Sequence, residues 1–153
     1  MPDVQHYNAQ YGNFASDLYA QIRKETFAED IGQNGWLTAP EQNHLIDWLR
    51  LNDGDRLLDV ACGSGGPTLR IADRTGANVF GVDIHADGIA EAARRAKDRN
   101  LAERATFEQI DGSRRLPFES DWFDGLICID AINHLPNRPR VLSAAGQPDA
   151  LGP

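Results

Sequence analysis

The chain has 153 residues, of which 41% are hydrophobic, and a formal net charge of −8 at pH 7. This length suits one domain with a reasonable core, and the acidic balance disfavours unspecific binding to nucleic acid, which needs clustered Lys and Arg residues. No apolar run reaches the length of a membrane span, no signal peptide opens the chain, and the two cysteines form no CxxC pair. We therefore expect a reduced, cytoplasmic protein without a structural metal that binds neither membranes nor nucleic acid.

The N-terminal third, residues 1–52, is expected to form a helical cap. Phe14, Leu18 and Ile22 recur every four residues, which predicts one apolar face of a first helix. The run Thr38-Ala39-Pro40-Glu41 is a capping-box pattern with proline in the first turn, and it predicts the start of a second helix. The apolar side of that second helix is expected to comprise Leu45, Ile46, Trp48 and Leu49.

Strands and helices then alternate along residues 53–142, the expected core. The predicted strands are 57–60, 78–83, 105–110 and 124–129, and the predicted helices are 68–74 and 86–100. This alternation is typical of an α/β fold with a parallel sheet, whose ligand crevice lies at the carboxyl ends of the strands. We expect a sheet of four strands with flanking helices.

An acidic residue stands at the end of each predicted strand, and the four are Asp59, Asp83, Asp111 and Asp130. A carboxylate at the end of an apolar strand needs a partner, so these residues are candidates for a binding site. Asp83 ends the second strand about 20 residues beyond Asp59, where a ribose-binding acid belongs in a nucleotide fold. That position alone suits NAD as well as other nucleotides.

A glycine-rich turn follows the first strand, and three kinds of site use such a turn. A phosphate-binding loop ends in Gly-Lys-Ser/Thr, which this chain lacks, and a dinucleotide fingerprint has a third glycine where this chain has Thr68. The run Asp59-Val60-Ala61-Cys62-Gly63-Ser64-Gly65 instead resembles motif I of the class I S-adenosylmethionine-dependent methyltransferases. Ala61 stands where many members carry the first glycine.

The resemblance covers residues 7 to about 142 and implies a Rossmann-like fold with the four strands in the order 3-2-1-4. It also implies S-adenosyl-L-methionine as the cofactor. In that family the acid matching Asp83 holds the ribose, and the acid matching Asp111 accepts from the adenine amino group. The acid matching Asp59 lies near the methionine part. The other positions that the resemblance assigns to cofactor binding are Ala61, Gly63, Gly65, Ile84, Gly112, Ile129, Tyr11 and Trp36.

Methyl transfer in this family is an in-line displacement at a sulfonium-bound carbon, here to a small-molecule acceptor. The protein then mainly aligns the nucleophile and excludes water, and some acceptors also need a base. His134 follows the fourth strand and is the candidate for that base, since histidine titrates near neutral pH. A histidine in this place also fits a structural role with a backbone hydrogen bond.

The last residues depart from the family pattern, which continues with a helix and three further strands. Residues 143–153 are rich in Gly, Pro and Ala and predict an irregular tail, so the sequence predicts a truncated fold with weak or no activity. The fourth strand would then be an apolar edge open to self-association. Two other functions stay open: a non-catalytic cofactor-binding or interaction module, and an NAD-dependent oxidoreductase. The position of Asp59 and the missing third glycine count against the oxidoreductase.

Overall fold

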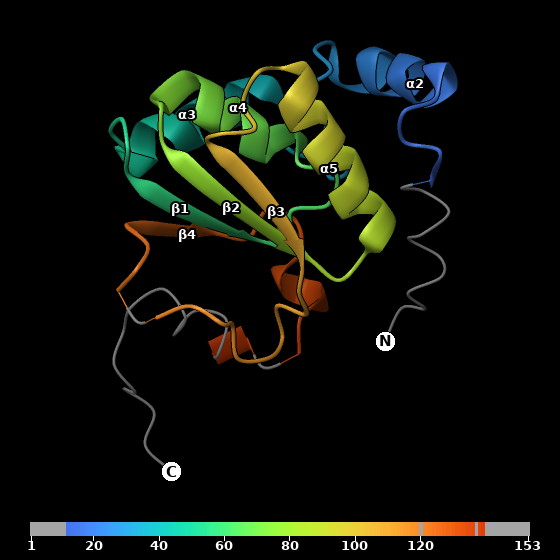
Figure 1. Cartoon of the computed structure of the whole chain (residues 1–153). Coiled ribbons are helices and arrows are strands. Elements are labelled where there is room, and N and C mark those ends of the chain that lie inside the picture. Colours follow the sequence, from blue (N-terminus) through green and yellow to red (C-terminus); the bar gives the residue numbers. More distant parts are fainter. Residues whose placement is uncertain (1–11, 120, 137, 140–153) are drawn as a thin grey trace.

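The computed structural model describes residues 12–119, 121–136 and 138–139. Figure 1 shows the arrangement of the helices and strands, and none of the helices in these ranges is long and apolar enough to cross a membrane. The elements are α2 (Asp17–Phe27), α3 (Ala39–Leu49), β1 (Arg56–Val60), α4 (Gly66–Thr75), β2 (Asn78–Asp83), α5 (Ala86–Asp98), β3 (Ala105–Gln109), β4 (Gly125–Ile127) and the 3-10 helix η1 (Ile132–His134). Tyr11 and the predicted tail 143–153 lie outside the described residues.

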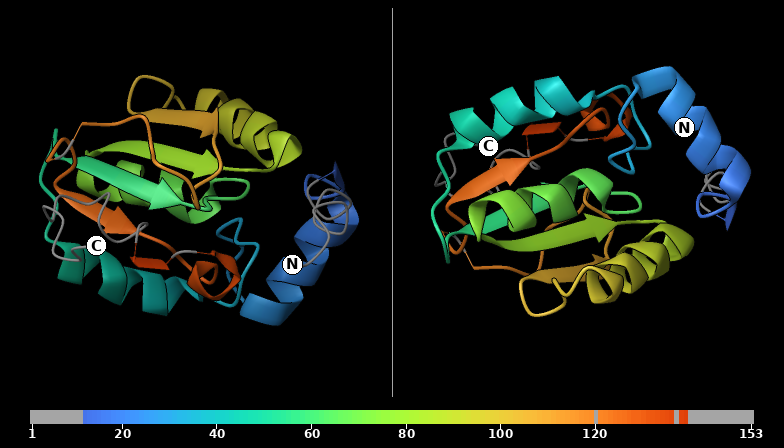
Figure 2. Two further views of the ribbon diagram at one scale, coloured as in Figure 1. Left: turned by 90° about the horizontal axis from the view of Figure 1, so that it is seen from below. Right: turned by 90° about the horizontal axis from the view of Figure 1, so that it is seen from above.

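The four strands form one parallel sheet in the order β3-β2-β1-β4, which confirms the predicted α/β fold and strand order. In its register Asp59 on β1 lies beside Gly81 on β2 and Ile127 on β4. The carboxyl ends of β1 and β2 therefore meet at the centre of one edge. Figure 2 shows that α2 lies beyond this edge, while the other helices lie along the sheet.

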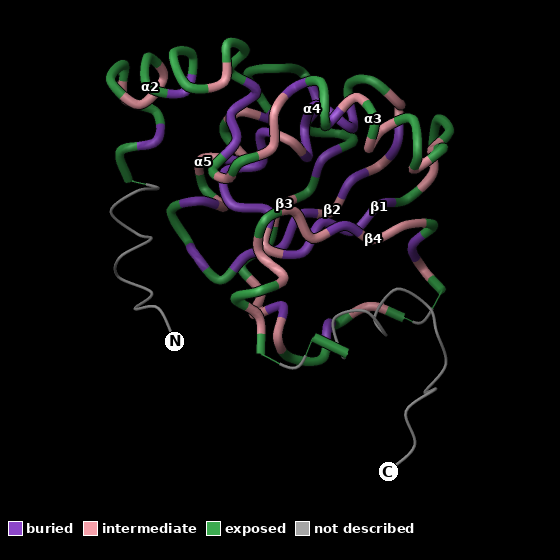
Figure 3. The backbone as a smooth tube through the Cα atoms, turned by 180° about the vertical axis from the view of Figure 1, so that it is seen from behind, coloured by how far each residue is buried: buried purple, intermediate pink, exposed green. Residues whose placement is uncertain are grey.

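One face of the sheet is covered by α3, α4 and α5, as Figures 1 and 3 show. The two central strands, β1 and β2, are largely buried (Figure 3). Leu57 of β1 and Val79 of β2 belong to the core on this face. The buried residues of this core are Leu57, Leu69, Ile71, Ala72, Val79, Ala96, Leu101, Ala105 and Ile127.

The opposite face packs against the long connection between β3 and β4 instead of a helix. The aromatic rings of this connection pack against each other and against Phe80 of β2. The ring centroids of Phe80 and Trp122 are 4.9 Å apart, and those of Phe118 and Phe123 are 5.0 Å apart. The connection between β3 and β4 thus covers Leu58 and Val60 with aromatic side chains. Aromatic pairs with this edge-to-face geometry add to the burial energy of the rings.

The apolar residues predicted to face inward from the N-terminal helices are only partly buried. Phe14 is buried, but it precedes α2, and Leu18 and Ile22 are 63% and 47% exposed. On α3 the predicted capping box is present, yet Trp48 is 76% exposed, so its expected place on the buried side was wrong. Phe14 packs instead beneath the Arg23 guanidinium, 4.1 Å from its ring centroid.

Candidate functional site

A cavity of about 390 Å³ opens at the carboxyl ends of the strands. Its walls come from the ends of β1, β2 and β4, from the turn after β3, and from residues 33–37 of the N-terminal region. Ten of the predicted site residues line it, namely Trp36, Asp59, Ala61, Gly63, Asp83, Ile84, Asp111, Gly112, Ile129 and His134. The structure thus brings together residues that lie up to 98 positions apart in the chain.

Asp83 is held through both of its carboxylate oxygens. Its side chain is buried, and its two oxygens accept the backbone N–H groups of Gly63 at 2.8 Å and His85 at 2.9 Å. Each carboxylate oxygen has two lone pairs, so both oxygens can still accept from a ligand. The bond to Gly63 also ties the end of β2 to the glycine turn.

Asp59 has one oxygen bound and one without a partner. Its Oδ2 accepts the Thr68 hydroxyl at 2.5 Å, whereas its buried Oδ1 has no hydrogen-bond partner in the described structure. Burial raises the pKa of Asp59 to about 7, with a further rise from the Asp83 charge, against the Thr68 hydroxyl, which lowers it. A buried acceptor without a donor is unfavourable, so this oxygen suits a ligand that brings an N–H or O–H group.

Asp111 is bound within its own turn. Its Oδ1 accepts the Ser113 hydroxyl at 2.6 Å and the Ser113 backbone N–H at 3.0 Å, and its Oδ2 accepts from Arg114 at 3.1 Å. The Ser113 hydroxyl is the main cause that lowers the pKa of Asp111, which stays ionised. Gly112 beside it is required by close packing, because a Cβ there would lie 2.6 Å from Val60 Cγ1.

Gly65 is not among the residues that line the cavity, although the motif resemblance assigns it to the cofactor. It caps α4 with φ +71°, and a Cβ there would lie 2.8 Å from the Ala92 Cβ and 2.9 Å from the Phe107 ring. The structure therefore places this glycine in the contact between α4, α5 and β3. Ala61, four residues before Gly65, does line the cavity. Its φ of 62° is in the left-handed region that favours glycine.

Apart from Trp36, the N-terminal wall of the cavity was not identified from the sequence. Gln33, Asn34 and Leu37 line the cavity together with Trp36, which is 80% exposed at its mouth. Asn34 Oδ1 accepts the Ser64 backbone N–H at 3.3 Å, which joins this wall to the glycine turn. The available signal was a pair of amide side chains between Gly32 and Gly35, directly before the capping box.

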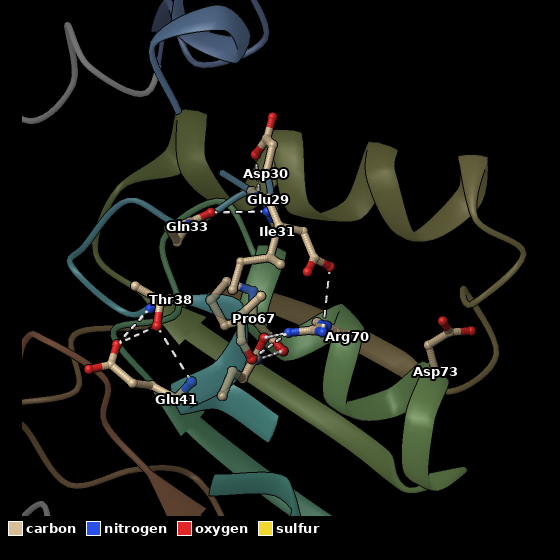
Figure 4. A network of polar contacts seen from close by, with 12 residues as sticks. Glu29, Asp30, Ile31, Gln33, Thr38, Glu41, Pro67, Arg70 and Asp73 are labelled. Atoms are coloured by element: carbon tan, nitrogen blue, oxygen red, sulfur yellow. Dashed lines mark hydrogen bonds and ion pairs between the residues drawn. The ribbon is translucent and has the colours of Figure 1, made fainter. Parts of the chain in front are cut away.

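A buried network holds this wall against α4 (Figure 4). The Arg70 guanidinium donates to the Ala39 carbonyl at 3.2 Å and to Gln42 Oε1 at 3.3 Å, and it lies 3.6 Å from Glu29. Gln42 Nε2 in turn donates to the Pro67 carbonyl at 2.7 Å. Residues 29–42 are therefore attached to the first turns of α4 at several points.

Metal binding and thiol chemistry find little support in the described ranges. No group of three or more His, Cys, Asp or Glu side chains there is placed to hold a metal ion. Cys62 and Cys128 are both free thiols. Burial raises the pKa of Cys62, and it raises that of Cys128 to about 12, so both stay protonated at neutral pH.

Comparisons with known proteins identify the family. The family model described as "Methyltransferase domain" matches residues 57–147. The chain is 28% identical over 140 residues to the 27-O-demethylrifamycin SV methyltransferase of Amycolatopsis mediterranei. The aligned region covers 86% of this chain and 51% of that protein. The chain is 33% identical over 135 residues to the sterol 24-C-methyltransferase ERG6 of Saccharomyces cerevisiae, and the alignment covers 88% of this chain and 33% of the relative.

A solved structure agrees with the sequence relatives. The SAM-dependent methyltransferase from Geobacter sulfurreducens in complex with S-adenosyl-L-homocysteine matches with a TM-score of 0.63 and 25% identity, over 84% of this chain and 51% of that chain. The chain thus spans about half the length of this structure and of the rifamycin relative. Because the family model covers more than half of its residues and motif I lies at the end of β1, the chain belongs to the S-adenosylmethionine-dependent methyltransferase family.

Proposed function

We propose that this chain binds S-adenosyl-L-methionine and takes part in methyl transfer to a small-molecule acceptor. The observation that carries the proposal is the pair of buried acids at the glycine turn, in which Asp59 keeps one oxygen without a donor. The cofactor has an ammonium group, a ribose diol and an adenine amino group, all of which donate hydrogen bonds. Three acids on one cavity wall match these three donors.

The residues present fit the cofactor one group at a time. Asp59 Oδ1 would accept from the ammonium group, and Asp83 retains lone pairs for the ribose hydroxyls. Asp111 and Gly112 would border the adenine, with Ile84, which is 44% exposed, against its face. When bound, the cofactor supplies an electrophilic methyl group on a sulfonium with a good leaving group.

The chain's own contribution to the reaction is orientation and exclusion of water. Trp36, Leu37, Ile129, Leu135 and Pro136 make the mouth of the cavity largely apolar, so we propose an apolar acceptor. Two relatives, named for a demethylrifamycin and for a sterol as acceptors, are in keeping with that class. His134 lies in η1 at the mouth, where it would take a proton from those acceptors that need a base.

Location and association form the rest of the proposal. Two free thiols support a reducing, cytoplasmic setting, and the charge of −8 supports a small acceptor over nucleic acid. In the described structure β4 pairs with β1 only, so its other edge is available for self-association. Its side chains are less exposed than the sequence predicts, because Ile127 is buried and Leu126 is half-buried.

Calorimetric titration with S-adenosylhomocysteine and with NADH tests the proposal. We expect S-adenosylhomocysteine to bind and NADH to give no heat of binding. The Asp83→Ala variant should bind S-adenosylhomocysteine at least about tenfold more weakly. Tighter binding of NADH would overturn the proposal in favour of an oxidoreductase. A methylation assay with apolar acceptors then separates an enzyme from a module that only binds the cofactor.

A further inference from the structure

Gln33 is a buried amide with one half unused. Its side chain lines the cavity and the residue is 3% exposed. The Oε1 atom accepts the Ile31 backbone N–H at 3.1 Å, as Figure 4 shows, whereas Nε2 has no partner within the described structure. Since the oxygen is held by Ile31, the amide presents its N–H donors without an acceptor, which buried amides rarely do.

The neighbours of Gln33 place it beside the glycine turn. Gly32 is packed so tightly on the start of α4 that a Cβ on Gly66 would lie 2.2 Å from its carbonyl oxygen. On the other side, Asn34 accepts the Ser64 N–H. Gln33 is therefore held between two contacts with the turn that follows Asp59. Gln33 and Asn34 line the same cavity.

A free donor and a free acceptor on residues that line one cavity match a zwitterion. Gln33 Nε2 suits a carboxylate, and Asp59 Oδ1 suits an ammonium group. The first turn of α4 adds the positive end of a ten-residue helix on the same side, which favours an anion. Building on the proposed function, we propose that Gln33 binds the carboxylate of the cofactor's amino-acid end, while Asp59 accepts from its ammonium group.

Gln42 shows what a purely structural glutamine does in this fold. It is also fully buried, but its Nε2 donates to the Pro67 carbonyl and its Oε1 accepts from Arg70. Both ends of that amide are used within the protein. The contrast assigns Gln42 to the structural network around Arg70 and leaves Gln33 available to a ligand.

The test compares three probes by calorimetry on the wild-type chain and on Gln33→Leu. S-adenosylhomocysteine carries both charged groups, its decarboxylated analogue lacks the carboxylate, and 5′-methylthioadenosine lacks the amino-acid end. We expect Gln33→Leu to lower the affinity for S-adenosylhomocysteine about tenfold or more, with the other two affinities unchanged within about twofold. An equal loss for all three probes, or no loss for any, would overturn the assignment.

Two further variants secure the interpretation. Gln42→Leu is the matched control, and it is expected to lower the unfolding temperature while the ratio of affinities for S-adenosylhomocysteine and its decarboxylated analogue stays as in the wild type. Gln33→Glu places a negative charge near the carboxylate and should shift that ratio further than Gln33→Leu. If the wild-type chain binds none of the probes, the proposed function itself fails, which is a different result from failure at Gln33.

Discussion

The Asp130 carboxylate accepts the backbone N–H of Trp36 at 2.7 Å, a hydrogen bond between residues 94 positions apart. The same Oδ2 accepts the Leu37 N–H at 3.2 Å. Asp130 directly follows the exit from β4, and residues 33–37 form the N-terminal wall, so this pair of bonds joins the two sides of the cavity mouth. The position of the exposed Trp36 thus depends on an acid in the segment that follows β4.

Replacing Asp130 with alanine should loosen that wall. Hydrogen bonds to an ionised carboxylate are stronger than neutral ones, so we expect amide exchange at Trp36 and Leu37 to become about tenfold faster. NMR-detected hydrogen exchange measures this directly. Asp130→Asn is the control, because asparagine tolerates the left-handed φ of 55° and keeps a side-chain acceptor. Equal exchange rates in Asp130→Ala and the wild type would show that these bonds do not hold the wall.

Replacing Ala61 with glycine should stabilise the protein. At φ 62° a non-glycine residue costs roughly 1–2 kcal/mol, of which the greater chain entropy of glycine cancels roughly 0.5–1 kcal/mol. We expect a net gain of up to about 1 kcal/mol in the free energy of unfolding, measured in urea. The same change at the exposed Ala90 of α5 should have the opposite sign, since glycine weakens a helix interior. A destabilised Ala61→Gly variant would contradict the strain argument.

The strands and the acids of the site are predictable because they depend on local pattern, whereas the strand order came from the family resemblance. Apolar runs that end in Asp59 and Asp83 define the central strands, and the parallel topology then places both acids at one edge. The exposure of Trp48 and Leu18 was not predictable in the same way. Helical spacing defines a face, but whether another element covers that face is decided by tertiary packing.

Gln33 and Gly65 illustrate the same limit at the site. The free N–H of Gln33 is a property of its surroundings, since Gln42 has the same chemistry and uses all of it. Gly65 matches motif I, yet its neighbours are Ala92 and Phe107 on the far side of the turn. A motif identifies which residues are needed, but the packing decides whether each one contacts a ligand or a neighbouring helix.

Replacing Gly65 with alanine should therefore reduce stability more than ligand binding. The positive φ and the 2.8 Å approach to the Ala92 Cβ both oppose a side chain, and we expect a loss of roughly 2–4 kcal/mol in the free energy of unfolding. Gly54→Ala is the matched control, because Gly54 has φ +85° but no atom within 4 Å of its Cβ position. Its loss should be only the backbone part, roughly 1–2 kcal/mol. If Gly65→Ala stayed as stable as Gly54→Ala but lost S-adenosylhomocysteine binding, Gly65 would be a ligand contact after all.

The ligand-free protein should lose stability as the pH rises from about 4 to about 7. Asp59 titrates near pH 3.8 when unfolded and at about 7 when folded, so between these values the folded state holds one more proton than the unfolded state. Stability then falls with rising pH, by roughly 2–4 kcal/mol across the window, and levels off above pH 7. Urea unfolding at pH 5 and pH 8 measures the difference.

Asp59→Asn is expected to remove most of this slope and to be more stable than the wild type at pH 8, since it avoids a buried charge. Asp87→Asn, a change at an exposed residue of α5, should leave the slope intact. Binding of S-adenosylhomocysteine should depend on pH in the opposite direction, because its ammonium group prefers the ionised Asp59 carboxylate. Below pH 7 the ligand must displace the proton of Asp59 to bind. The affinity should accordingly rise with pH up to about 7 in the wild type and stay flat in Asp59→Asn. A pH-independent affinity in the wild type would mean that Asp59 does not face the ligand's charge.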